Sequence, residues 1–91
     1  MKPTQHPTRQ PGYRLEELDG ELLLYHLDQT QIISCNQTAS LIWQLCDGSR
    51  SVAEITQLLI EAYPEAEADI RRDVADTLAQ FAQHGAILLS E

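Results

Sequence analysis

Few residues of this chain have the types and spacing that catalysis or metal binding requires. The two cysteines, Cys35 and Cys46, lack the CxxC spacing of a redox or zinc site, and both have apolar neighbours. The three histidines, His6, His26 and His84, lie far apart in the sequence. These patterns predict two buried structural thiols, no metal site and no cofactor.

Catalytic motifs are also missing from the sequence. There is no glycine-rich phosphate loop, no HExxH motif, and no Ser or Cys nucleophile beside an obvious base. Most of the fourteen Asp and Glu residues fall at turns, helix starts or polar helix faces, where they serve solubility and capping. We therefore expect a protein that is not an enzyme. A weak enzyme would need two carboxylates with a raised pKa in one pocket.

The charge balance points away from nucleic acid. Fourteen acidic residues against six basic ones give a formal net charge of −8. A DNA-binding surface needs clustered cations to displace counterions from the phosphates. Arg71 and Arg72 are the one adjacent pair of basic residues in this chain. On charge alone, we expect no nucleic-acid partner.

The length of 91 residues leaves room for one small domain. Residues 1–12 contain three prolines and no apolar periodicity, which predicts a flexible N-terminal tail before a domain over residues 13–91. The tail lacks the apolar core of a secretion signal, and no apolar run approaches the roughly 20 residues that span a bilayer. We therefore expect a cytoplasmic protein with no membrane partner.

The first part of the domain has the pattern of a β-meander. Tyr13–Leu18 and Glu21–Leu27 flank Asp19-Gly20, a dipeptide that favours a tight hairpin turn. Thr30–Cys35 is rich in β-branched residues and predicts a third strand. Short connections make the three strands antiparallel, and the first and last strands are then open sheet edges.

After Cys35 the apolar period changes from two residues to about 3.6, which predicts helices. Asn36 can cap the first helix, and Asp47-Gly48 ends it. The segment Ser51–Glu54 fits a capping box at the start of a second helix. Tyr63-Pro64 ends that helix, because a residue before proline avoids the helical conformation.

A third helix begins in the acidic segment Glu65–Asp69 and ends at His84-Gly85. Its apolar positions lie on a single face and are Ile70, Val74, Leu78 and Phe81. Ala86–Ser90 then forms either a short final strand or an apolar tail. The predicted fold class is α+β and winged helix-turn-helix-like, with a three-stranded antiparallel meander followed by three helices.

An open strand edge beside the third helix favours a peptide-binding function. An extended peptide can dock on such an edge as an added strand. The third strand holds no proline or lysine to block this pairing, and its candidate residues are Thr30, Gln31, Ile32, Ile33 and Ser34. One flank of the third helix offers small side chains and a cation, and its candidate residues are Arg71, Ala75, Leu78, Ala79 and Ala82.

Arg71 and Arg72 are cations on an otherwise acidic protein and have two interpretations. One or both anchor a carboxylate of the bound peptide by a charge-assisted hydrogen bond. Alternatively, both pair within the helix or at its start with acidic residues at helical spacing, namely Asp69, Asp73, Asp76 or Glu67.

Strands followed by three helices also describe a winged-helix regulator that binds DNA or a regulatory protein. This is the alternative function. Its recognition helix would be Ile70–His84, in which Asp73 and Asp76 balance the two arginines. Such a helix would approach phosphates without a favourable field, so the charge pattern makes DNA binding the second choice.

Several short motifs between Leu24 and Gly85 are specific in combination. They are Asn36-Gln-Thr38-Ala39, Ile42-Trp43, Leu45-Cys46-Asp47-Gly48, Ser51-Val52, Glu54-Ile55, Tyr63-Pro64, Ile70, Asp73-Val74, Leu78 and Gly85. This pattern resembles the PqqD-like family, whose fold is also called the RiPP recognition element. The resemblance covers roughly two-thirds of the chain. In the strands, the chemical character of the residues matches better than their identity.

The resemblance implies a winged helix-turn-helix-like fold that is not used for DNA. Members of that family bind the leader of a ribosomally made precursor peptide and present it to a modifying enzyme, such as a radical S-adenosylmethionine maturase. The founding member acts in pyrroloquinoline quinone biosynthesis. The leader is bound as an extra strand on the third strand, against the third helix. On this chain, that implies a site at Thr30–Ser34 and on the helix flank containing Arg71.

Overall fold

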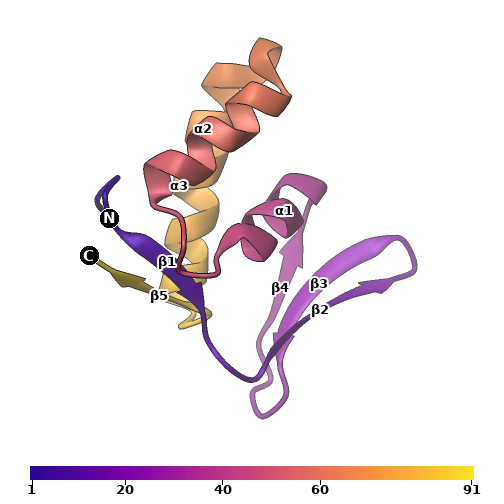
Figure 1. The fold of residues 1–91 in the computed structure, drawn as a ribbon. Coiled ribbons are helices and arrows are strands. Elements are labelled where there is room, and N and C mark those ends of the chain that lie inside the picture. The colour runs from indigo at the N-terminus through magenta and orange to yellow at the C-terminus, as the bar shows by residue number, and fades with distance from the viewer.

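The computed structural model describes residues 1–91 and contains two small antiparallel sheets and three α-helices (Figure 1). In chain order the elements are β1 His6–Arg9, β2 Tyr13–Leu18, β3 Glu21–His26, β4 Ile32–Cys35, α1 Gln37–Leu45, α2 Val52–Ala62, the 3-10 turn η1 Pro64–Ala66, α3 Glu67–Gln83 and β5 Ile87–Ser90. The predicted α+β class, with a meander followed by three helices, is confirmed. None of the helices has the length and apolar character to cross a bilayer.

The meander is the sheet β2-β3-β4. Asp19 and Gly20 both have positive φ angles, of 52° and 82°, so the β2–β3 connection has the left-handed residues that a tight hairpin requires. β4 begins at Ile32, two residues later than the sequence predicts. β3 ends at His26, whose ring Nδ1 accepts a hydrogen bond from the Asp28 amide (3.0 Å), and residues 27–31 form the connection to β4.

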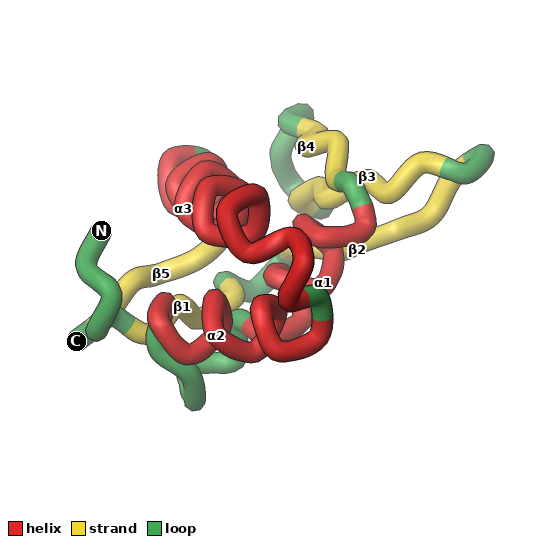
Figure 2. Tube along the Cα trace, turned by 90° about the horizontal axis from the view of Figure 1, so that it is seen from above, coloured by secondary structure: helices red, strands yellow, loops and turns green.

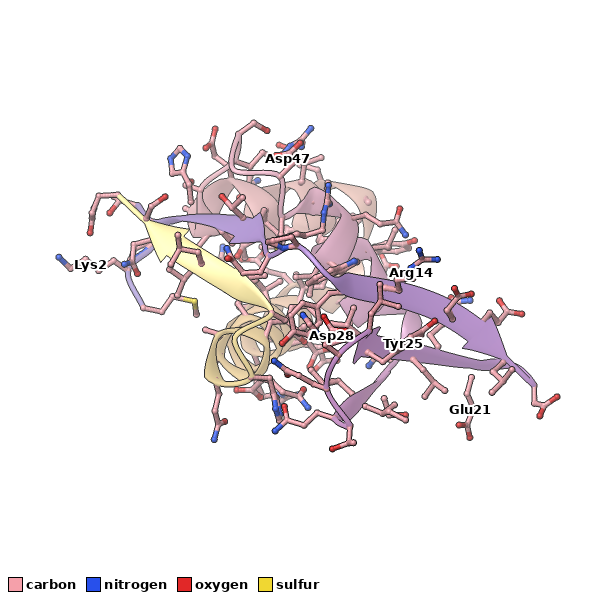
Figure 3. All side chains as sticks on the ribbon, turned by 90° about the horizontal axis from the view of Figure 1, so that it is seen from below. Lys2, Arg14, Glu21, Tyr25, Asp28 and Asp47 are labelled. Carbon is pink, nitrogen blue, oxygen red and sulfur yellow. The ribbon has the colours of Figure 1, made fainter.

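The N-terminal segment differs from the prediction of a flexible tail over residues 1–12. Residues 6–9 form β1, which pairs antiparallel with β5 from His6↔Ser90 to Arg9↔Ile87. This pairing also shows that the end of the chain forms a strand, one of the two outcomes that its sequence left open. Figure 3 shows Lys2 beside β5, where it forms an ion pair with Glu91 at 3.4 Å.

Hydrogen bonds to two helix ends hold the N-terminal segment in place. The amides of Val52 and Ala53, in the first turn of α2, donate to the carbonyls of Gln5 (2.9 Å) and Pro3 (3.0 Å). At the other helix end, the Arg9 guanidinium donates to two carbonyls in the last turn of α1, at 3.0 and 2.7 Å. Helix ends leave such backbone groups without partners inside the helix. The N-terminal segment supplies those partners. The pattern of apolar residues in the sequence does not predict such backbone contacts.

The hydrophobic core contains side chains from the meander and from all three helices. Its fully buried side chains include Leu24 of β3, Ile42 of α1, Ile55 of α2, and Leu78 and Phe81 of α3. All four positions of the apolar face predicted for α3 are buried. The predicted helix caps also form, because Asn36 accepts a hydrogen bond from the Ala39 amide and Ser51 shares a reciprocal capping box with Glu54.

The contacts of Arg9 generate a stability prediction. Arg9→Ala should lower the free energy of unfolding by about 1–2 kcal/mol, because two carbonyls at the end of α1 lose a charged donor. Urea unfolding followed by circular dichroism measures the change. Arg14→Ala is the matched control, since Arg14 is an exposed arginine on β2 (Figure 3) and its loss should cost no more than about 0.5 kcal/mol. Equal losses in the two variants would contradict the capping role.

Candidate functional site

β4 is an edge strand of the meander, and β3 is its strand partner. Ile33 and Cys35 turn their side chains into the core, whereas Ile32 and Ser34 face solvent. Outside the ladder with β3, no backbone–backbone hydrogen bond involves residues 30–35. The outer edge of β4 therefore offers amide and carbonyl groups to which another strand can bind.

α3 borders this open edge and runs in the opposite direction to β4. Near the start of β4, the Oε1 atom of Gln31 lies 3.1 Å from Nδ1 of His84, the C-cap of α3. Past the end of β4, Thr38 of α1 and Asp73 of α3 line the same pocket. Figure 2 shows no helix or strand between β4 and α3. From Asp73 to His84 the helix advances about 16 Å, which is close to the length of a four- or five-residue strand.

The pocket at the end of β4 has a volume of about 400 Å³ and lies between α1, α2 and α3. We call it the helix-junction pocket. Its apolar wall consists of Leu41, Leu59, Tyr63, Ala66 and Ile70. Its polar wall consists of Gln37, Thr38, Glu65, Asp69 and Asp73. The lining therefore combines apolar surface with three carboxylates and contains no basic side chain.

The structure places the strand residues of the predicted site at this edge. Ile32, Ile33 and Ser34 belong to β4, and only Ile33 of these three is buried. Thr30 and Gln31 precede the strand and are exposed. The predicted strand residues thus lie together along one open margin.

The predicted residues of α3 do not face that margin. Arg71 and Ala75 instead line a hollow on the other side of the helix, together with Val52 and Ala53 of α2. The other members of that set are the fully buried Leu78, the exposed Arg72 and Ala79, and Ala82, which is partly buried against the core.

The flank of α3 that faces β4 carries different residues. Asp73 and His84 mark its two ends, and Thr77 and Gln80 occupy the turns between them at helical spacing. The sequence alone favours the opposite flank, whose alanines leave room for a peptide, because it does not show which side of the apolar face approaches the strand. Only the contact between His84 and Gln31 shows which side approaches the strand.

Arg71 and Arg72 both form ion pairs within α3. The Arg71 guanidinium lies 3.0 Å from the Glu67 carboxylate, and that of Arg72 lies 2.8 Å from the Asp69 carboxylate. These are the intrahelical pairs of the second interpretation. They leave α3 without a cluster of free cations for phosphate contacts.

Both cysteines are free and buried, as predicted. Burial raises the pKa of the Cys46 thiol to about 12, against a smaller lowering effect of nearby Arg9. Burial also raises the pKa of Cys35. The Cys46 thiol donates to the Ile42 carbonyl at 3.0 Å. Neither thiol is therefore an ionised nucleophile near neutral pH.

Two carboxylates have shifted pKa values, and both shifts are downward. Hydrogen bonds from the Ser49 side chain and amide lower the pKa of Asp47. Hydrogen bonding with Ser51 lowers that of Glu54 in the capping box. Both groups are ionised at neutral pH and hold turns and helix starts in place. The histidines, cysteines and carboxylates form no group of three that could hold a metal ion.

The comparisons with known proteins agree with this architecture. A family model described as Coenzyme PQQ synthesis protein D (PqqD) matches residues 21–87. The chain belongs to the PqqD family. The family resemblance predicted from the sequence motifs is thereby confirmed.

Two relatives in the PqqD family carry the name PqqA binding protein. PqqA binding protein 1 of Pseudomonas putida is 38% identical over 80 residues, which cover 85% of this chain and 79% of the relative. The PqqA binding protein of Rahnella aquatilis is 35% identical over 82 residues, covering 85% and 82%.

A solved structure, TbiB1 in complex with the TbiA(beta) leader peptide, has the same fold as this PqqD-family chain. Its TM-score is 0.67 at 21% sequence identity, and the match covers 88% of this chain and 93% of TbiB1. The order of strands and helices predicted from the sequence is therefore a known arrangement.

The thiol environments generate a chemical prediction. Iodoacetamide at about pH 8 should alkylate Cys46 of the folded protein only very slowly, because its thiol is buried and protonated. Cys35, which is 9% exposed, should react faster than Cys46, and both should react rapidly in concentrated urea. Mass spectrometry of the labelled peptides measures the rates. Rapid labelling of Cys46 in the folded protein would contradict the assignment of a buried thiol.

Proposed function

We propose that this member of the PqqD family is a non-catalytic peptide chaperone that acts in the cytoplasm. It binds the leader of a ribosomally synthesised precursor peptide as a strand added to β4. It then presents the precursor to a modifying enzyme, such as a radical S-adenosylmethionine maturase. Because relatives with 38% identity are named PqqA binding proteins, we propose PqqA as the precursor and pyrroloquinoline quinone biosynthesis as the pathway.

The observation that carries this proposal is the open edge of β4 beside α3. No strand of the chain itself covers that edge, because β1 and β5 pair with each other in a separate sheet on the opposite side of the molecule (Figures 1 and 2). A peptide strand on this edge gains backbone hydrogen bonds whatever its sequence, and its side chains can contact the neighbouring flank of α3. Residues 13–91 supply both surfaces.

Charge supports a peptide rather than DNA as the ligand. The chain has a formal net charge of −8. A winged-helix protein would contact DNA through α3. The two arginines of this helix form ion pairs with Glu67 and Asp69. A helix of this kind has little attraction for a phosphate backbone.

Calorimetric titration with synthetic PqqA of Pseudomonas putida tests the proposal. We expect saturable binding of one peptide per chain. Hydrogen exchange followed by mass spectrometry should show slower exchange in β4 of the complex, because its outer amides acquire partners. β2, the other edge strand of the same sheet, serves as the internal control and should exchange unchanged. Absence of binding, or protection confined to β2, would overturn the proposal.

A pair of proline variants tests the edge directly. Ile32→Pro should weaken peptide binding by about tenfold or more, because proline deforms the strand that pairs with the peptide and removes an amide. Glu17→Pro places proline at an exposed position on the opposite edge of the same sheet, where the amide points away from β3, and should change the affinity by less than about twofold. Circular dichroism should show the same helical content in both variants. Equal affinities for PqqA would show that β4 is not the docking strand.

A further inference from the structure

We propose that the helix-junction pocket receives a lysine or arginine side chain of the bound peptide. The protein then selects leaders that carry a basic residue just beyond the segment paired with β4. This inference rests on the proposed function and adds a specificity site to it.

The pocket lies where a peptide would leave β4. Gln37 and Thr38 line the pocket and follow Cys35, the last residue of β4, by two and three positions. An extended peptide advances about 3.3 Å per residue. A segment paired along the whole of β4 therefore brings the next one or two side chains to the pocket without any rearrangement of the strand.

The apolar wall suits the stem of a long basic side chain. Leu41 and Tyr63 are large apolar residues that remain 39% and 50% exposed at the surface. Lysine and arginine pack their methylene groups on such surfaces and keep the charged head in a polar environment. The exposed Leu41 and Tyr63 would be covered in the complex.

The polar wall supplies an uncompensated negative charge. The ion pairs of the protein employ Glu91, Asp47, Glu67 and Asp69 as their acidic partners. Glu65 and Asp73 take part in none of them, although both line the pocket. Asp73 is also half-buried, so solvent screens it less than the exposed carboxylates of α3. A cationic head in the pocket can form a charge-assisted hydrogen bond with one of these carboxylates, whereas an acidic side chain is repelled.

The matched variants Asp73→Asn and Asp76→Asn test this assignment. Each removes one negative charge from α3, but Asp76 is exposed and does not line the pocket. Titration with PqqA of Pseudomonas putida should show about three- to tenfold weaker binding for Asp73→Asn and a change below about twofold for Asp76→Asn. The affinity of Asp73→Asn should also depend less on salt than that of the unmodified protein.

Peptide variants identify the side chain that enters the pocket. Each Lys and Arg of PqqA is replaced in turn by Met, which preserves the apolar stem and removes the charge. One replacement should weaken binding to the unmodified protein and have little further effect on Asp73→Asn, as expected for two groups in contact. Glu65→Gln provides a second protein variant in case Asp73→Asn changes the thermal unfolding curve.

The outcomes separate the two proposals. If PqqA binds and protects β4 from exchange, but Asp73→Asn and Glu65→Gln leave its affinity unchanged, the pocket inference is wrong and the proposed function stands. Equal weakening by Asp73→Asn and Asp76→Asn would reveal a general effect of net charge and would also overturn the pocket. If the unmodified protein binds no PqqA, the proposed function itself fails.

Discussion

The unpaired edge of β4 is the constraint on which the rest of this structure depends. Backbone amides and carbonyls require partners, and a strand at a sheet edge has half of its groups without one. The chain has two terminal strands that could cover this edge, yet β1 and β5 pair with each other at the opposite side of α3. The two terminal strands are thus paired with each other, and the outer edge of β4 stays open.

The N-terminal segment contributes to the site indirectly, by holding the helices that form its walls. Its backbone satisfies amides at the start of α2, and Arg9 satisfies carbonyls at the end of α1. α1 and α2 together provide four of the ten residues that line the helix-junction pocket. A pocket whose walls are fixed before the ligand arrives loses less conformational freedom on binding. The segment at residues 3–9 is therefore part of the scaffold of a site that it does not touch.

Much of the fold follows from local sequence signals. Asp19-Gly20, the Asn36 cap and the Ser51–Glu54 capping box each specify a turn or a helix start through contacts within a few residues, and all three form. The sequence does not predict β1, because its partners are distant backbone groups and its four residues show no alternation of apolar and polar side chains. The sequence does not predict the orientation of α3 either, for a similar reason. One flank of its apolar face is rich in alanine and the other is polar. The tertiary contact between Gln31 and His84 shows that the polar flank meets the strand.

The motifs through which the chain resembles its family combine structural and lining residues. In the N-x-T-A motif, Asn36 caps α1, whereas Thr38 lines the helix-junction pocket. In the D-V motif, Val74 is buried in the core, whereas its neighbour Asp73 lines the same pocket. Adjacent residues on a helix point in different directions, so one short motif can anchor an element and shape a surface. These two motifs lie far apart in the chain, and the fold brings their outward-facing members to one place, in the pocket near the end of β4.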